Sequence, residues 1–554
     1  MINKIGVENR NVNSVRISTP NNSKVVSSPS FKGGPWSALL WGIQECEKNP
    51  MINVAVVDMF SAILPRTFVE SLTNWFAGFE AFRRESSGLI VNCLIPSVIT
   101  WGAALGLNKM IMPKGTDMAS CWADNSLINR ATEISSQLAK SENYNLATNK
   151  LENFKESLKE IIRNTEGYHG KNKVIFRDVL TEAEIEKYAK ELSELTKDKS
   201  NKQIKEATKR IAKEIADKTH VYENIALGGG KSTVKASTVK TLLEDSVKFF
   251  KGFNNVAEKM NINEFAQKSK KLVKSKSAIG MLIVLPLAAS MQYINRWITE
   301  KMSGTKGAPI YEDFGKEQNE EVRKKSQEGL LKQKIISITS MIGVGLLSMM
   351  KKPSWNMFEF KGWFPTMDQA RIISTTTFAS RMAAADDKNE LAESTVRDIA
   401  TFSGLYFLGD YAGKATATII ENKTGVQLLN DTKPISKDAN IIKRFWHWVK
   451  DVNIKSSEEV ISKTKEALKG ATPTPEQEKQ IAKELKRATN LRSACQVANL
   501  GVSLVLLGLI IPIFTRSKTK KKHEEAIKMA QNNASPSAQE PNDLEKPLNR
   551  SKTK

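Results

Sequence analysis

The most constraining feature of the sequence is a run of twenty uncharged residues from Cys495 to Phe514, CQVANLGVSLVLLGLIIPIF. An α-helix rises about 1.5 Å per residue, so such a run matches the roughly 30 Å hydrocarbon core of a bilayer. We therefore expect a membrane span here. Cations follow it at once and favour a cytoplasmic C-terminus in contact with anionic lipid headgroups; they are Arg516, Lys518, Lys520, Lys521 and Lys522.

Three further apolar runs predict additional spans. Gly88 to Leu107 is also twenty residues without a charge, whereas Ala278 to Ile294 and Ile335 to Met350 have seventeen and sixteen residues. Cations flank both shorter runs, and long basic side chains at the end of a span can extend to the interface. The sequence therefore predicts an all-α fold, a multi-span helical membrane protein with helical water-exposed regions.

A fifth run, Ile399 to Ile420, has the length of a span but contains Asp410 and Lys414. Residues four apart share one face of a helix, so these two charges can neutralise each other. If the run crosses the bilayer, the two residues form an intramembrane ion pair, which would mark a polar cavity or transport path. If it does not, they form an ordinary solvated contact, which is the interpretation we favour.

Two neighbouring features of the sequence bear on the same question. Met367 to Ala385 is a predicted helix, but Arg371 and Arg381 favour a surface position over a crossing. Residues 84–89, RESSGL, weakly echo residues 397–405, RDIATFSGL, since each has a basic–acidic pair before Ser-Gly-Leu. Transporters often contain repeated halves, although chance can produce so loose a match.

The segment before the Gly88 run favours the membrane surface. Ile52 to Leu64 is apolar but has only thirteen residues, includes Asp58 and stops at Pro65, which suits an interfacial or re-entrant segment. Aromatic residues then recur at three- and four-residue steps, which predicts a helix with one aromatic face. That face either lies at the headgroup boundary or packs against other helices; its candidate interfacial residues are Phe68, Trp75, Phe76, Phe79 and Phe82.

Residues 113–277 are rich in Lys, Glu, Asn and Ala and predict a soluble helical bundle or coiled-coil hairpins. Thr181 with Glu184, and Ser200 with Gln203, fit capping boxes at helix N-termini. The sequence GGGKST at 228–233 resembles the end of a phosphate-binding loop, but the required earlier glycine is absent and no strand pattern precedes it. We therefore interpret it as a linker between helices.

These segments divide the chain into eight parts. In order, we expect a disordered tail (1–34), interfacial helices with the first span (35–112), the soluble helical region (113–277), two spans with a helical loop (278–350), an amphipathic helix with the candidate span (351–424), soluble helices with a stalk (425–490), the last span (491–515) and a basic disordered tail (516–554).

Composition narrows the chemistry. The formal charge of +23 indicates attraction to polyanions, and the predicted spans make lipid a better partner than nucleic acid, which we do not expect. The four cysteines and four histidines show no ligand spacing, so the sequence predicts no metal site and no cofactor. Since no catalytic motif is present, an enzyme is the least supported class, although a site built from carboxylates has no sequence signature.

The first thirty-five residues carry one resemblance. A leader rich in Asn and Ser that ends in Phe31-Lys32-Gly33 resembles the start of uncharacterised proteins from gut-dwelling, non-photosynthetic relatives of cyanobacteria. The resemblance implies a bacterial source, and hence a cytoplasmic membrane, but no activity.

The sequence is compatible with two functions. The first is an integral membrane structural or interaction protein that presents helical regions at the bilayer and contacts anionic lipid, protein partners or further copies of itself. The second is a transporter or channel with polar groups in broken spans. Four spans would place both termini opposite residues 113–277, whereas a fifth span would place those residues in the cytoplasm and export the N-terminal tail.

Overall fold

The computed structural model describes most of the chain between Pro50 and Thr515. The residues it describes are 50–515 apart from 73–74, 140–149, 170–171, 198, 222, 229–233, 304–327, 350–354, 431–438, 451, 456 and 468–474, together with residue 42 and five positions between 517 and 528. The two predicted disordered tails therefore lie almost wholly outside the described residues.

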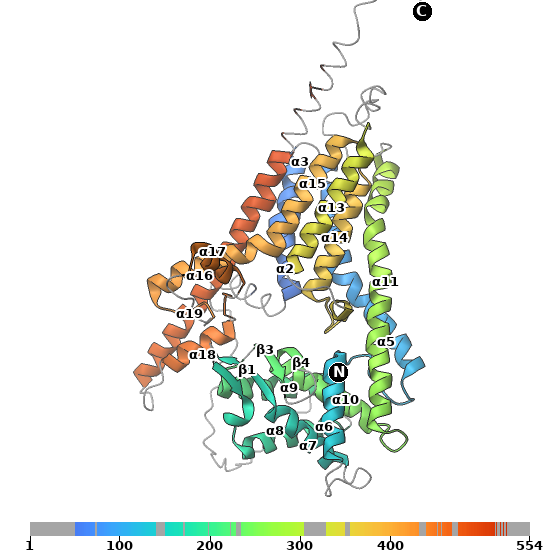
Figure 1. The fold of residues 1–554 in the computed structure, drawn as a ribbon. Coiled ribbons are helices and arrows are strands. Elements are labelled where there is room, and N and C mark those ends of the chain that lie inside the picture. The colour runs from blue at the N-terminus through green and yellow to red at the C-terminus, as the bar shows by residue number, and fades with distance from the viewer. Residues whose placement is uncertain are drawn as a thin grey trace, which may run out of the picture.

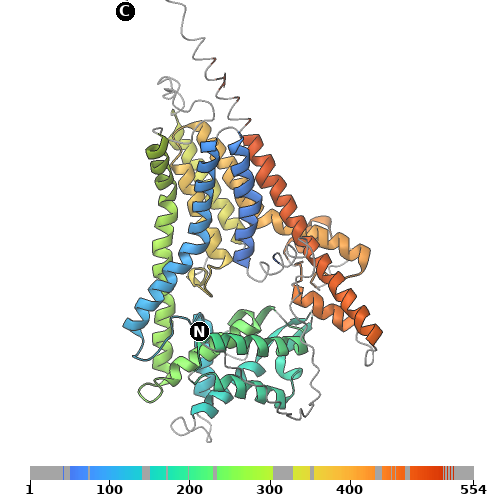
Figure 2. The same cartoon turned by 180° about the vertical axis from the view of Figure 1, so that it is seen from behind.

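The described residues form three regions (Figure 1). A helical bundle comprises residues 50–112, 262–408 and 495–515, a strand domain comprises residues 113–261, and a side lobe comprises residues 409–494. The strand domain lies beyond one end of the bundle, and the side lobe projects from the bundle near that end (Figures 1 and 2). The fold is mostly helical, as the sequence predicts.

The bundle is built from long helices, several of which include a π-helical turn. In chain order its elements are α2 (Pro50–Asp58), η1 (Met59–Ile63), α3 (Leu64–Ser71), α4 (Trp75–Leu89), η2 (Ile90–Leu94), α5 (Ile95–Ile111), α11 (Ile262–Ser303), α13 (Leu330–Met349), η4 (Trp355–Phe358), α14 (Met367–Ala383), α15 (Lys388–Ser403), η5 (Gly404–Leu408) and η6 (Leu504–Ile510). The last of these continues α19 (Pro475–Ser503), which begins in the side lobe.

Five helices are long and apolar enough to cross a membrane, namely Met51–Ser71, Trp75–Ile111, Ile262–Met302, Leu330–Met349 and Lys479–Thr515. The last four coincide with the four runs for which the sequence predicts spans, although the final residue of the run Ile335–Met350 lies outside the described residues. The helix Met51–Ser71 is not among the predicted spans. There α2, η1 and α3 form one unbroken helix through Pro65, which is longer than the thirteen-residue interfacial segment that we expected. The run Ile399–Ile420 is helical from α15 into the side lobe but is not among the five.

Prolines within three of these helices directly follow a π-helical turn. Pro65, Pro96 and Pro512 each lie two residues after the end of η1, η2 or η6. Proline lacks a backbone N–H and clashes with the carbonyl four residues earlier, so a helix must change its hydrogen-bond register to accept it. A π turn makes that change, because it shifts the bonds from four residues to five. The helix thus continues where the sequence suggests an end.

The strand domain contains helices on a four-stranded sheet, which corrects the all-α prediction for this region. Its strands are ordered β2-β1-β3-β4, and every neighbouring pair is antiparallel. The elements are α6 (Asn125–Leu138), α7 (Lys150–Arg163), β1 (Thr165–His169), β2 (Asn172–Ile175), η3 (Phe176–Asp178), α8 (Glu182–Glu194), α9 (Asn201–Thr219), β3 (Glu223–Leu227), β4 (Val234–Thr238) and α10 (Val239–Asn254). Strands of four or five residues are too short to show a clear alternation of apolar and polar side chains.

The phosphate-loop sequence connects two strands, and its residues 229–233 lie outside the described residues. β3 ends at Leu227 and pairs directly with Val234 at the start of β4, so residues 228–233 connect two antiparallel strands rather than two helices. A phosphate-binding loop instead leads from a strand into a helix. The two predicted capping boxes are confirmed, since Thr181 begins α8 and Ser200 begins α9 with both reciprocal hydrogen bonds present.

The side lobe packs three helices against the first half of α19. These are α16 (Gly409–Thr424), α17 (Ile441–Lys450) and α18 (Ser457–Ala467). Its core includes Ala417, Leu428, Val460, Ala488 and Cys495, all of them buried. The helix from Lys479 to Thr515 is continuous, as the sequence predicts, and carries the chain from this lobe into the bundle.

Pro50, the strand domain and Thr515 are distributed between the two ends of the bundle differently from both predicted topologies. α2 begins at the end that faces the strand domain, and α4 with α5 returns the chain to that end (Figure 1). The final helix leaves the bundle at the opposite end (Figures 1 and 2). Pro50 and the strand domain therefore share one end, and Thr515 lies at the other. The difference arises because the helix Met51–Ser71 crosses the bundle once more than the sequence predicts.

Candidate functional site in the helical bundle

Five charged side chains meet inside the bundle at the contact of two helical hairpins. Arg66 on α3 forms an ion pair with Glu85 on α4, with Nη1 2.7 Å from Oε1. Arg381 on α14 forms an ion pair with Asp398 on α15 at 2.9 Å, and Nε of Arg397 lies 3.1 Å from the same oxygen of Asp398. We call these five residues the ion-pair network. Only 1% of the Asp398 side chain and 5% of the Arg66 and Arg381 side chains is exposed.

The network connects the two hairpins in both directions. Arg381 also reaches Glu85 of the first hairpin, at 3.5 Å. In return, Nη2 of Arg66 donates a hydrogen bond to the Thr401 hydroxyl of the second hairpin, also at 3.5 Å. Arg66 and Arg381 therefore each pair with the acid of their own hairpin, and each also contacts the second helix of the other hairpin. An apolar bundle gains a fixed register from such contacts, because any slip would leave a buried charge without its partner.

The weak sequence echo falls on this network. Its two basic–acidic pairs are Arg84-Glu85 and Arg397-Asp398. Both acids contact Arg381, and both pairs precede a π-helical turn, η2 in the first hairpin and η5 in the second. The two short matches, far apart in the sequence, thus lie side by side in the structure.

A second layer of polar contacts ties α11 to the same hairpins. Arg296 forms an ion pair with Glu390 at 2.6 Å and another with Asp386. One turn further along α11, Nη2 of Arg83 donates to the Thr299 hydroxyl at 2.7 Å, and that hydroxyl donates to Glu80 at 2.8 Å. Three helices are therefore linked near the end of the bundle that is remote from the strand domain.

Several polar atoms of the network have no hydrogen-bond partner among the described residues: Nε of Arg66, Nε of Arg381, Nη2 of Arg397 and Oδ2 of Asp398. Leaving a buried polar group without a partner is costly, so an unpartnered atom in a core calls for a physical reason. The unpartnered atoms include donors of all three arginines and an acceptor oxygen of Asp398, so the geometry of the network leaves both kinds of atom unpaired. These atoms are where a water molecule or an ion inside the bundle would bind.

The structure corrects the surface position expected for Met367–Ala385. α14 lies inside the bundle, with Ile373, Phe378 and Arg381 among its buried residues. The sequence shows the arginine but not the two acids that neutralise it, because Glu85 is almost three hundred residues away. Arginine can be buried when its donors are paired with carboxylates in this way. The echo was the one sequence signal that pointed to these residues.

The predicted pair Asp410 and Lys414 is only partly visible. The side chain of Asp410 lies outside the described residues. Lys414 is buried in the side lobe, where its ammonium group donates to the Val449 carbonyl at 3.2 Å and lies 5.5 Å from the Tyr411 ring centroid. Lys414 therefore joins α16 to α17.

Most of the predicted interfacial aromatics are exposed. Phe68, Trp75, Phe79 and Phe82 lie on the outside of the bundle, whereas Phe76 is half-buried. Of the cations after the last helix, Lys521 is described and exposed, and the other four lie outside the described residues. The exposed aromatics and Lys521 are therefore available for the lipid contacts predicted for them.

A second buried charged cluster lies where the strand domain meets α11. Lys276 is fully buried, donates to the Cys121 carbonyl at 2.7 Å and lies 4.1 Å from the Trp122 ring centroid. Asp245 on α10 accepts a hydrogen bond from the Trp122 amide at 3.2 Å. Burial raises the pKa of Asp245 to about 7, and the nearby Lys248 opposes that rise. The carboxyl therefore titrates near neutral pH at a contact between two regions.

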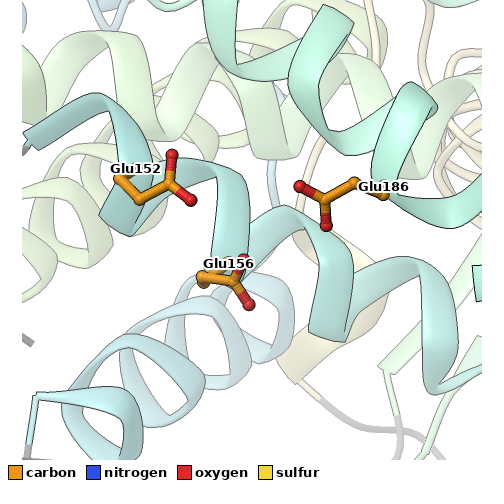
Figure 3. Close-up of side chains that lie close together, drawn as sticks. All are labelled: Glu152, Glu156 and Glu186. Atoms are coloured by element: carbon orange, nitrogen blue, oxygen red, sulfur yellow. The ribbon is translucent and has the colours of Figure 1, made fainter. Parts of the chain in front are cut away.

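Three carboxylates of the strand domain approach one another closely enough to be considered as a metal site. Glu152 and Glu156 on α7 and Glu186 on α8 have carboxylate oxygens within 4.8 Å of one another (Figure 3). Lys155 and Lys159 lie 2.6 and 2.7 Å from Glu186. Hydrogen bonds from these two lysines lower the pKa of Glu186 to about 2. The cluster is thus a surface ion-pair network in which ammonium groups already supply the positive charge.

Comparison with known proteins adds no relative to this description. The chain matches no protein-family model, no curated protein and no solved structure.

Proposed function

We propose that this chain is an integral membrane protein that holds the strand domain beside the bilayer as a module for contact with partners. The observation that carries this proposal is the exposure of large apolar side chains on the long helices of the bundle. Leu282 on α11, Leu347 on α13 and Trp75 on α4 are each more than 70% exposed. Lipid is the solvent in which such a surface is stable.

The spacing of exposed tryptophans supports a bilayer of ordinary thickness. A Cβ on Gly280 of α11 would lie 2.3 Å from the Thr100 hydroxyl oxygen of α5, so Trp101 lies near the level of Gly280. The Trp101 ring contacts Trp363 at 5.7 Å between centroids. Trp297, also exposed, is seventeen residues beyond Gly280 on α11, roughly 26 Å at 1.5 Å per residue. Tryptophan is enriched at the two bilayer interfaces, which are about 30 Å apart.

α11 provides the mechanical connection that this function needs. Its forty-two residues run unbroken from Ile262 beside the strand domain to Ser303 at the far end of the bundle. Lys276 and Trp122 fix the strand domain to this helix close to the lower tryptophan level. The strand domain is therefore held at a fixed height rather than on a flexible tether.

Extraction of membranes tests the proposal directly. We expect the full chain to stay with vesicles in alkaline carbonate and to require detergent for a monodisperse state. If the protein is instead released by carbonate and remains monodisperse without detergent, the exposed apolar surface is covered by protein and the proposal is wrong.

The arrangement of the bundle ends makes a prediction about sidedness. If the C-terminus is cytoplasmic, residues 113–261 lie across the membrane from it. We expect a thiol reagent that cannot cross membranes to label Lys202→Cys and Lys443→Cys from one side and Glu524→Cys from the other. Labelling of all three from the same side would contradict the membrane-spanning arrangement.

Contact with anionic lipid is the finer part of the proposal. Lys521 is exposed beyond the last helix, and the sequence places Arg516, Lys518, Lys520 and Lys522 beside it. A basic cluster just beyond a span binds acidic headgroups with about 1 kcal/mol per cation. Replacing the five by Gln should abolish any preference of the protein for vesicles that contain phosphatidylglycerol in a flotation assay. An unchanged preference would assign lipid binding to other cations.

Transport is the second candidate, and the ion-pair network favours it. Charged residues inside a membrane bundle often line a path for ions or protons. The test is flux of protons or chloride into proteoliposomes, measured with ion-sensitive dyes. A transport role predicts measurable flux that is lost in Arg381→Leu/Asp398→Leu, provided that the variant keeps its wild-type yield. No flux in the wild type, or equal flux in both, leaves the network a structural role.

A further inference from the structure

α17 of the side lobe is strongly two-sided. At 100° per residue, the six apolar residues of IIKRFWHWVK occupy one side of the helix and the four basic or imidazole residues occupy the other. The apolar side consists of Ile441, Ile442, Phe445, Trp446, Trp448 and Val449, and the polar side consists of Lys443, Arg444, His447 and Lys450. The overall polarity of residues 425–490 concealed this short helix in the sequence.

The two ends of the apolar side have different surroundings. Towards the C-terminal end, Trp448 stacks on Tyr411 of α16 at 5.8 Å, and Val449 is buried. Towards the N-terminal end, the same side is open: Ile441 is 82% exposed, Ile442 64% and Phe445 57%. The last turn of α17 thus attaches the helix to the lobe, while the first two turns present large apolar groups outward.

The attachment of α17 fixes its level relative to the final span. Lys414 of α16 donates to the Val449 carbonyl at 3.2 Å. One residue earlier, a Cβ on Gly413 would lie 3.4 Å from the carbonyl oxygen of Cys495. Cys495 is the first residue of the twenty-residue uncharged run on α19, so α17 lies at the level where that run begins.

We propose that α17 is an interfacial helix that lies in the headgroup plane of the leaflet nearer the strand domain. Its open apolar residues enter the acyl boundary, and Lys443 and Arg444 contact lipid phosphates. This inference rests on the proposed membrane location of the bundle. The mixture of Ile, Phe and Trp on one side and cations on the other is the composition that binds a bilayer surface, and the level of Cys495 is where that surface lies.

Site-directed spin labelling of the full-length protein in phosphatidylcholine–phosphatidylglycerol vesicles tests this placement. The background is Cys46→Ser, since the remaining cysteines, Cys93, Cys121 and Cys495, are buried. Nitroxides at Ile442→Cys and Phe445→Cys should be relaxed more by oxygen than by a water-soluble nickel complex, at a depth of about 5–10 Å. The matched label at Lys443→Cys on the polar side should show the reverse preference.

A label at Leu347→Cys, on the exposed side of α13, separates this inference from the membrane proposal. If that label contacts lipid while those at 442 and 445 are as accessible to nickel as the one at 443, the interfacial position of α17 is wrong and the membrane location stands. If the label at 347 is also accessible to nickel, the membrane proposal itself fails. Labels at 442 and 445 that are shielded from both reagents would show that protein covers the helix, which also overturns the inference.

Discussion

The strand domain and the helical bundle differ in where their large apolar side chains lie. In the described part of the strand domain, apolar residues such as Phe250 and Ile211 form one core, and Val179 is the only exposed large apolar side chain. In the bundle, large apolar side chains such as Leu282 and Leu347 are exposed, while Arg381 and Asp398 are buried. The bundle thus has the surface that we propose for a region in lipid, whereas the strand domain has the surface of a region in water.

This difference explains why the mean hydropathy of the whole chain is a poor guide to the environment of either region. A mean hydropathy of -0.36 describes a soluble protein, but it averages two regions that obey different rules. In water, burial of apolar area stabilises a fold. In lipid that gain disappears between helices, so paired polar groups and close packing contribute more to the choice of partner helix. If lipid surrounds the bundle, as we propose, the ion-pair network contributes to that choice.

The largest expected effect comes from removing one charge of the network. Asp398→Asn keeps the shape of the side chain and the Oδ1 acceptor but removes the negative charge that pairs with Arg381 and Arg397. Breaking a buried ion pair costs about 3–5 kcal/mol. The matched change in the strand domain is Asp178→Asn, where an exposed ion pair with Arg177 contributes about 0–1 kcal/mol. Thermal unfolding in detergent measures both. Equal shifts in Tm would contradict the burial of the network.

The next effect tests which solvent surrounds the bundle. Leu282→Arg places a cation among exposed apolar residues of α11 and should cost about 2.5–3.5 kcal/mol if lipid surrounds it. Val179→Arg makes the same change on the surface of the strand domain, where water solvates the cation and the effect should stay within about 0.5 kcal/mol. The measurement is the carbonate-resistant fraction in membranes. Similar fractions for both variants would remove the contrast between the two regions.

A third effect concerns the contact between the regions and depends on pH. The pKa of Asp245 is raised to about 7 from its ordinary value near 4, so the folded state binds more protons than the unfolded state between these values. Stability should therefore fall as pH rises from about 4 to 7, by at most about 1.4 kcal/mol per pH unit. Asp245→Asn keeps the acceptor for the Trp122 amide and should flatten this dependence. Unfolding in detergent at several pH values between 4 and 8 would show it, and an equal slope in the variant would exclude Asp245 as the cause.

The sequence predicts those parts of the fold that depend on neighbours along the chain. The uncharged run from Cys495 to Phe514, the capping box at Thr181 and the stalk of α19 all follow from local spacing. The sheet was missed because its strands are short and pair through contacts that the sequence does not show. The helix through Pro65 was missed because π-helical turns have no simple sequence signal.

The ion-pair network was missed for a related reason. A lone arginine in an apolar helix is costly to bury, so the sequence predicts a surface position for Arg381. The partner that neutralises it comes from another hairpin. Glu85 is separated from it by the whole strand domain in sequence. The repeated basic–acidic pair at Arg84-Glu85 and Arg397-Asp398 is visible in the sequence, but it predicts no contact between the two hairpins. Pairing of distant charges is thus the information that local spacing lacks.

The smallest expected effect compares two helix caps of the same design. Thr181 caps α8 in the strand domain and is exposed, whereas Thr366 caps α14 in the bundle, where its partner Gln369 is fully buried. Loss of a cap hydroxyl costs about 0.5–2 kcal/mol. Water can replace the hydroxyl of Thr181 but has less access to α14, so Thr181→Ala should lie near the lower limit and Thr366→Ala near the upper. Thermal unfolding of both variants in detergent provides the comparison. If Thr181→Ala lowered the Tm more than Thr366→Ala, access of water to the cap could not explain the difference between the two helices.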